Sequence, residues 1–179
     1  MSVQSNVRRR TNRALLIVGV GLVSSVLASC NDDSTAAPTP APAPLVRFRA
    51  SLAGAEEVPP VTTTASGTAD FTLSRTNDTL FVNITVNGLS NVRFGHFHTG
   101  ARGANGAVVA FLVDPPTLAG PQTGRIGKQF ITAANLSGTL LNQPLTALID
   151  QIRAGTIYVN LHTDANPGGE LRGQVALVP

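Results

Sequence analysis

Cysteine and charge are both scarce in this sequence. Cys30 is the only cysteine, so no disulfide can form within the chain. Four of the 13 Lys and Arg residues (Arg8, Arg9, Arg10 and Arg13) precede Cys30, which leaves nine basic residues against ten acidic ones after it. That region therefore has a net charge near −1 and no basic stripe for phosphates, which excludes nucleic-acid binding.

The sequence also lacks the usual motifs of catalytic sites. It has no Gly-x-Ser-x-Gly, no cysteine after position 30, and no glycine-rich loop between a strand and a helix. Glu56 and Glu57 are adjacent and point to opposite faces of an extended chain, so they do not form a glycosidase-type carboxylate pair. We therefore expect no enzymatic activity.

The N-terminus has the pattern of a targeting segment, because basic residues at 8–13 precede an apolar run from Ala14 to Leu27. This run is shorter than the about 20 residues of a membrane-spanning helix, although an uncleaved anchor is the alternative. Leu27-Ala28-Ser29-Cys30 resembles the lipobox of bacterial lipoproteins, in which the cysteine is diacylated. We expect residues 1–30 to be a lipoprotein signal peptide. An acylated Cys30 would tether the protein outside the cytoplasm, to the cell membrane or the outer membrane.

The composition changes twice after Cys30. Residues 31–44 are rich in Pro, Ala and Thr and contain no aromatic residue, which predicts a disordered stalk. From Leu45 onward, short runs of Val, Ile, Thr and Phe are separated by Gly, Asn and Pro, a pattern typical of antiparallel sheets. Residues 45–179 are therefore predicted to form one all-β domain.

About eight strands are predicted in this domain, arranged as an antiparallel Greek-key sandwich or barrel. The predicted strands are 46–52, 67–74, 79–87, 92–99, 107–113, 124–131, 156–163 and 170–177. Strands 67–74 and 79–87 are expected to form a hairpin. Between Pro144 and Gly155, apolar residues at helical spacing predict one short helix that packs on the core.

The three histidines of the chain are the candidates for chemistry. His96 and His98 lie two apart in a predicted strand and so share a face, and His162 lies on the polar face of another strand. If these strands are neighbours, the three imidazoles meet and can bind copper or zinc. Ring nitrogens within about 4 Å of one another would favour such a site, given the ligand distances of metal centres, and imidazoles more than about 8 Å apart would remove it.

Other polar residues near the histidines have alternative interpretations. Asp164 is a candidate ligand or an orienting group for an imidazole. Glu170 and Arg172 share a strand face and are expected to form a structural ion pair that orders the preceding turn. The alternative for the histidines is that His96 and His98 are outward residues of an edge strand, while His162 bonds a loop.

Three blocks of the sequence resemble the CHRD domain, which is named for chordin and is also found in microbial proteins. They lie in residues 48–61 with Glu57-Val58-Pro59-Pro60, in 96–106 with His96-Phe97-His98-Thr99-Gly100, and in 154–174 with Asn160-Leu161-His162-Thr163. The resemblance extends over residues 46–178. It implies an extracellular all-β module without an assigned reaction, and the growth-factor antagonism of chordin is not carried over.

A second resemblance is to copper–zinc superoxide dismutase, whose copper-binding strand also carries a His-x-His between glycines. That family uses more histidines than the three present here, so the resemblance implies at most a reduced, single-metal site. Two hypotheses result. The first is a non-enzymatic, monomeric CHRD lipoprotein of the cell envelope with an unidentified protein or polysaccharide partner. The second is a copper- or zinc-binding protein that uses His96, His98 and His162.

Overall fold

The structure is a computed structural model that describes residues 45–179. The predicted signal peptide, Cys30 and the predicted stalk lie outside the described residues. Strands predominate, and short 3-10 turns occupy Gly54–Glu56, Ala133–Asn135 and Gly138–Leu140. The strands are β1 (Arg47–Ala53), β2 (Ser66–Leu73), β3 (Thr79–Thr99), β4 (Val108–Val113), β5 (Leu118–Ile126), β6 (Phe130–Thr132), β7 (Ile157–Thr163), β8 (Leu171–Gln174) and β9 (Ala176–Leu177). The helix α1 spans Leu145–Arg153.

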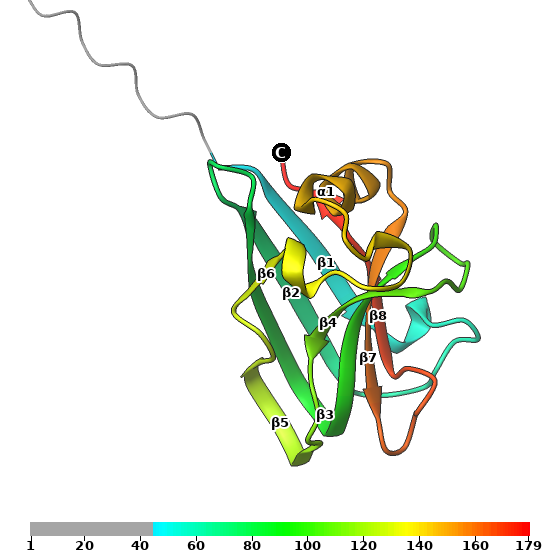
Figure 1. Ribbon diagram of the computed structural model, residues 1–179. Coiled ribbons are helices and arrows are strands. Elements are labelled where there is room, and N and C mark those ends of the chain that lie inside the picture. The colour runs from blue at the N-terminus through cyan, green and yellow to red at the C-terminus, as the bar shows by residue number, and fades with distance from the viewer. Residues whose placement is uncertain (1–44) are drawn as a thin grey trace, which may run out of the picture. The chain divides into compact units, whose positions relative to one another are not determined.

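The long strand β3 closes the sheet into a barrel (Figure 1). Its first part pairs with β2, from Leu80 opposite Leu73 to Asn87 opposite Ser66. Its last part pairs with β7 on one side and β4 on the other. Because β7, β8, β1 and β2 are also paired in that order, the antiparallel ladder returns to β3.

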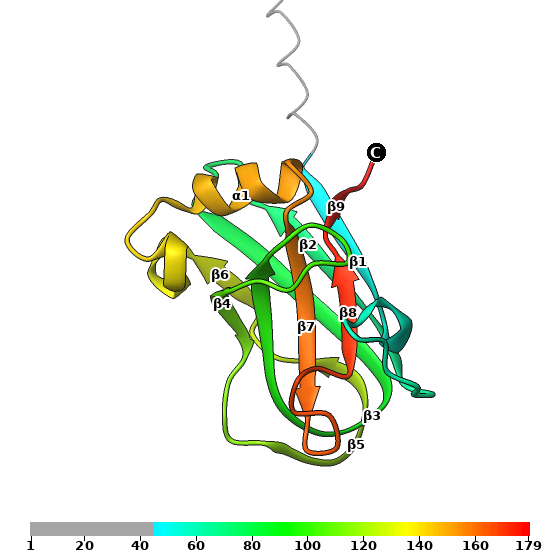
Figure 2. The ribbon, with the colours of Figure 1, turned by 90° about the vertical axis from the view of Figure 1, so that its right-hand side faces the viewer.

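The alternation of side chains separates an apolar interior from a polar outer face on the strands that carry the histidines. Phe97, Val159 and Leu161 are fully buried in the hydrophobic core. Their sequence neighbours therefore point to the outside of the barrel. The helix α1 lies across one end of the barrel, with Leu145, Leu148, Ile149 and Ile152 buried (Figures 1 and 2). Within residues 45–179, no helix has the length and hydrophobicity needed to cross a membrane.

The structure confirms the predicted all-β class, the hairpin and the short helix. Two predicted strands, 79–87 and 92–99, are instead parts of β3, because positive φ angles at Gly88 (69°) and Asn91 (51°) bend the strand without ending it. The predicted strand 124–131 is wrong, since Gly127 with a φ of 77° separates β5 from β6. The predicted strand 170–177 is interrupted at Val175, whose N–H bonds the carbonyl of Ile157.

The interior packing gives a stability prediction. Phe97 is 0% exposed and its ring centroid lies 5.0 Å from that of Phe71. Phe97→Ala is expected to lower the free energy of unfolding by about 3–5 kcal/mol, because it removes buried apolar surface and leaves a cavity. Urea unfolding measures this, with Phe130→Ala as the control: Phe130 is 54% exposed, and a loss below about 1 kcal/mol is expected. Equal losses in the two variants would contradict the assignment of the core.

Candidate metal centre

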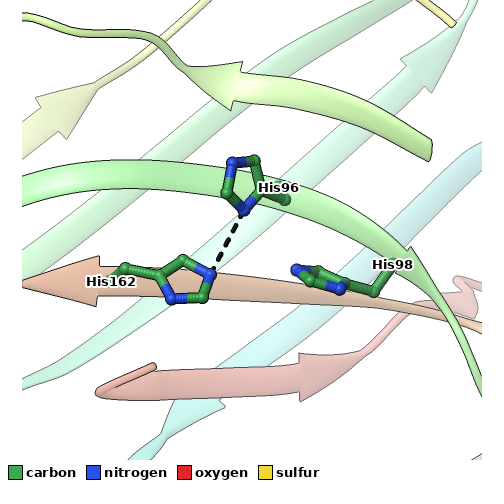
Figure 3. A group of neighbouring side chains, drawn as sticks. All are labelled: His96, His98 and His162. Atoms are coloured by element: carbon green, nitrogen blue, oxygen red, sulfur yellow. Dashed lines mark hydrogen bonds between the residues drawn. The ribbon is translucent and has the colours of Figure 1, made fainter. Parts of the chain in front are cut away.

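The three histidines converge on the outer face of the barrel from two paired strands. His98 lies opposite Tyr158 and His96 opposite Asn160, so β3 and β7 bring His162 alongside the pair. One ring nitrogen from each histidine lies within 4.8 Å of the others, and His96 Nδ1 is 3.2 Å from His162 Nε2 (Figure 3). The three imidazoles therefore converge as expected: the His96–His162 pair meets the 4 Å criterion for a bound metal, whereas the set as a whole extends to 4.8 Å.

The cluster is buried although it lies outside the barrel. His96, His98 and His162 are 8%, 9% and 9% exposed, because the loop at residues 100–107 crosses in front of β7 (Figure 2) and the turn at 164–169 follows His162. The part of β3 with His96 and His98 lies between β4 and β7. This position excludes the alternative that the two histidines belong to an exposed edge strand.

Two backbone carbonyls fix the orientation of two rings. His98 Nδ1 is 2.9 Å from the carbonyl oxygen of Gly106, and His162 Nδ1 is 3.0 Å from that of Pro167. A carbonyl only accepts, so each Nδ1 must carry the proton and each Nε2 must carry the lone pair. Metal-binding histidines in proteins are oriented in this way by a bond from the second ring nitrogen.

Close packing at Gly106 allows this arrangement. A Cβ atom at Gly106 would overlap the carbonyl oxygen of Thr99, so only glycine fits where the loop returns to β3. The N–H of Gly106 donates to the hydroxyl of Tyr158 at 3.1 Å, while its carbonyl accepts from His98. One glycine therefore connects the loop to both side chains.

Aromatic rings surround the imidazoles. The ring of Phe94 stacks on His96 at a centroid distance of 5.8 Å, and the ring of Phe111 meets His96 edge-on at 4.6 Å. Tyr158 stacks on His98 at 4.9 Å with an interplanar angle of 10°. These rings keep water from the cluster and hold the imidazoles in place.

Burial keeps the three imidazoles neutral. Loss of hydration, reinforced by the charges that His162 and His98 would carry, lowers the pKa of His96 to about 4. Burial also lowers the pKa of His98 and that of His162, against the opposing effect of their carbonyl partners. Neutral imidazole is the form that binds metals, so the site is ready for an ion at neutral pH.

Asp164 does not join the cluster. Its side chain is 56% exposed, and its carboxylate lies 3.5 Å from Nε of Arg93. The predicted role of Asp164 as a ligand or orienting group is therefore wrong, because the carbonyls of Gly106 and Pro167 orient the rings instead.

The expected ion pair between Glu170 and Arg172 is also wrong for the described residues. The carboxylate of Glu170 accepts hydrogen bonds from the hydroxyls of Thr63 (2.7 Å) and Thr163 (2.6 Å). Although burial opposes it, these bonds hold the pKa of Glu170 below its ordinary value. Glu170 lies just before β8, and its carboxylate is directed to Thr63 and Thr163 instead of Arg172.

Arg172 holds the loop that covers the histidines. Its guanidinium donates to the side-chain oxygen of Asn105 at 2.9 Å and to the carbonyl of Ala104 at 2.6 Å. The same group lies 3.5 Å from the centroid of the Tyr158 ring. Arg172 is thus structural, as expected from the sequence, but through this loop and a cation–π contact.

Sequence reasoning missed a buried polar pair beside the cluster. Asn160 donates to Oε2 of Glu57 at 3.4 Å, and both side chains are at most 5% exposed. A Cβ at Gly169 would collide with both, which explains a glycine with a φ of 132° there. In the sequence, Asn160 lies between Tyr158 and His162 on the polar face of the predicted strand. This position was the signal that could have identified Asn160 as part of the site. No periodic pattern in the sequence marks Glu57 as buried.

Some buried polar atoms on this outer face of the barrel have no hydrogen-bond partner. Among the described residues, the buried side-chain atoms without a partner are Nε2 of His96, Nε2 of His98, Oε1 of Glu57 and Oδ1 of Asn160. Unpartnered buried polar atoms are rare in folded proteins, and each calls for an explanation such as an ordered water or a bound ion. Nε2 of His98 is available to a metal ion within the cluster, whereas His96 faces His162 with Nδ1 and not with its unpartnered Nε2 (Figure 3).

The fold and the cluster together define a small antiparallel barrel module with a buried group of imidazoles. The CHRD domain family matches residues 48–175, so the chain belongs to that family. Neither the curated proteins nor the solved structures contain a match to the chain.

The environment of Glu57 predicts a pH-dependent stability. Burial raises the pKa of Glu57 from 4.5 to about 7, although the charge of Arg172 and the bond from Asn160 oppose the rise. The folded protein therefore holds this proton more tightly than the unfolded chain. The resulting stabilisation is complete below pH 4.5 and is lost as the pH rises to 7.

Glu57→Gln is expected to remove this pH dependence, because glutamine has a similar shape and does not ionise. Its free energy of unfolding should exceed that of the wild type above pH 7, by up to about 3 kcal/mol. Urea unfolding of both proteins between pH 4.5 and 8 makes the comparison. Parallel pH profiles would show that folding does not raise the pKa of Glu57.

Proposed function

We propose that this chain is a non-enzymatic CHRD module that binds one copper or zinc ion through His96, His98 and His162. The observation that supports the proposal best is the orientation of the rings. Backbone carbonyls hold the Nδ1 protons of His98 and His162, so the lone pair of each ring is on Nε2. The lone pair of His98 has no partner, and that of His162 accepts a hydrogen bond from Nδ1 of His96 at 3.2 Å, which a bound ion would replace. Metal–nitrogen bonds of about 2.0–2.1 Å require only small rotations of rings whose nitrogens are already within 4.8 Å.

The cost of leaving a buried polar atom without a hydrogen-bond partner supports the same function. A buried polar atom without a hydrogen-bond partner costs about 1–3 kcal/mol, and Nε2 of His98 is such an atom within the imidazole cluster. A bound ion would replace this cost with coordination bonds. An all-apolar face would avoid the cost more simply, so a purely structural role does not explain three histidines in one buried cluster.

The predicted location is compatible with this role. We propose that diacylated Cys30 tethers the module to an extracytoplasmic membrane surface and that residues 31–44 separate it from the lipid. The lipobox-like Leu27-Ala28-Ser29-Cys30 and the absence of further cysteines support this placement. The lack of a nucleophile or carboxylate pair in the sequence supports a binding role rather than an enzymatic one.

The first experiment measures metal content. The full chain is incubated with excess zinc or copper and desalted, and the bound metal is quantified by mass spectrometry. The wild type should retain one ion per chain, and the double variant His96→Ala/His98→Ala should retain none. Asp164→Ala is the matched control, because this exposed carboxylate is outside the cluster and its loss should leave the metal content unchanged. Equal metal content in the wild type and the double variant would refute the site.

A second experiment tests the anchor. Cys30→Ser removes the only thiol and should leave the protein as an unprocessed precursor or release it from membranes. Detergent partitioning and the intact mass of the protein report both outcomes. The anchor is absent if the wild type and the variant show the same partitioning and the same unmodified mass.

A further inference from the structure

The ligands of the candidate site carry no negative charge. The cluster consists of three imidazoles, and no carboxylate or cysteine of the described residues belongs to it. Many divalent sites in proteins include thiolate or carboxylate ligands that offset the charge of the ion. A divalent ion bound here would keep both positive charges in a buried place.

A buried cation lies near the cluster. Arg172 is 2% exposed, and its guanidinium carbon lies 3.5 Å from the centroid of the Tyr158 ring, which itself stacks on His98. A single aromatic ring thus contacts both the arginine and an imidazole. The positive charge of Arg172 disfavours further positive charge at the cluster, and more strongly for a divalent ion than for a monovalent one.

The nearby carboxylates do not compensate for this charge. Glu57 is buried and shares a hydrogen bond with Asn160, and its raised pKa keeps much of it protonated near neutral pH. Glu170 is bound by two threonine hydroxyls, and Asp164 is exposed beside Arg93. Because the cost of burying an ion increases with the square of its charge, a divalent ion costs about four times as much as a monovalent one.

The number of ligands also favours a monovalent ion. Structural zinc sites take about four protein ligands and catalytic zinc sites take three plus a water, whereas the described residues supply three nitrogens and aromatic rings that shield them from water. Copper(I), a closed-shell monovalent ion, accepts three-coordinate geometry and nitrogen ligands. The described residues contain no sulfur ligand, because the only cysteine and the only methionine are Cys30 and Met1. Selectivity at this site would therefore come from charge and coordination number.

We infer that the three-histidine site selects copper(I) over zinc(II) and copper(II). The inference rests on the proposed metal-binding function and specifies which ion the same site takes.

The test compares affinities in one protein. The full chain carrying Cys30→Ser, which removes the competing thiol, is titrated with copper(I) without oxygen against a chromophoric copper(I) chelator. Separate titrations use zinc(II) and copper(II) with their own chelators. One copper(I) should bind per chain, with a dissociation constant lower than that of zinc(II) by about tenfold or more. Adding His162→Ala should abolish this binding.

The outcomes separate the two claims. Zinc(II) binding at one ion per chain, as tight as copper(I) or tighter, would overturn the selectivity and leave the proposed function intact. Failure of all three ions to bind would refute the proposed function itself.

Charge variants test the cause of the selectivity. Arg172→Gln should strengthen zinc(II) binding more than copper(I) binding and reduce their affinity ratio by about tenfold, while Arg172→Lys should preserve the ratio. Glu57→Gln at pH 8 removes a negative charge and should change the ratio in the opposite direction. Unchanged ratios in the folded variants would overturn the electrostatic explanation.

Discussion

Two hydrogen bonds from imidazoles to backbone carbonyls fix the tautomers of two rings in the histidine cluster. Gly106 accepts from His98 and Pro167 accepts from His162, and in each ring the proton on Nδ1 leaves a lone pair on Nε2. Without these carbonyls, either tautomer would be available and the rings would be free to turn. With them, the cluster presents neutral nitrogen donors in a place from which water is largely excluded. The proposed metal binding depends on this arrangement.

The rest of the domain supports the two carbonyls. The bend in β3 lets one strand close the barrel and carry two of the histidines, and its pairing with β7 adds the third. Arg172 fixes the loop that contains Gly106 through Asn105 and Ala104. Glu170 and Thr163 fix the turn that contains Pro167, since Thr163 also accepts from the N–H of Asn166. Glu170 and Arg172 therefore serve separate loops of the same site.

Period-two alternation was sufficient to predict the all-β class, the hairpin and the shared face of the histidines. It did not predict that 79–99 is one strand, because turn-like residues such as Gly88 can bend a strand without ending it. The burial of Glu57 and the carbonyl partners of the rings depend on long-range loop positions that a local pattern does not encode. Asp164 follows His162 closely in sequence, yet it points to solvent and Arg93, so proximity in sequence was misleading there.

The most direct test of this account is the tautomeric state of the imidazoles in the metal-free protein. Nitrogen-15 NMR of the histidine rings at neutral pH distinguishes the protonated nitrogen from the one with the lone pair. The account predicts neutral rings with the proton on Nδ1 in both His98 and His162. Protons on Nε2, or rings that are charged or average rapidly between tautomers, would contradict it.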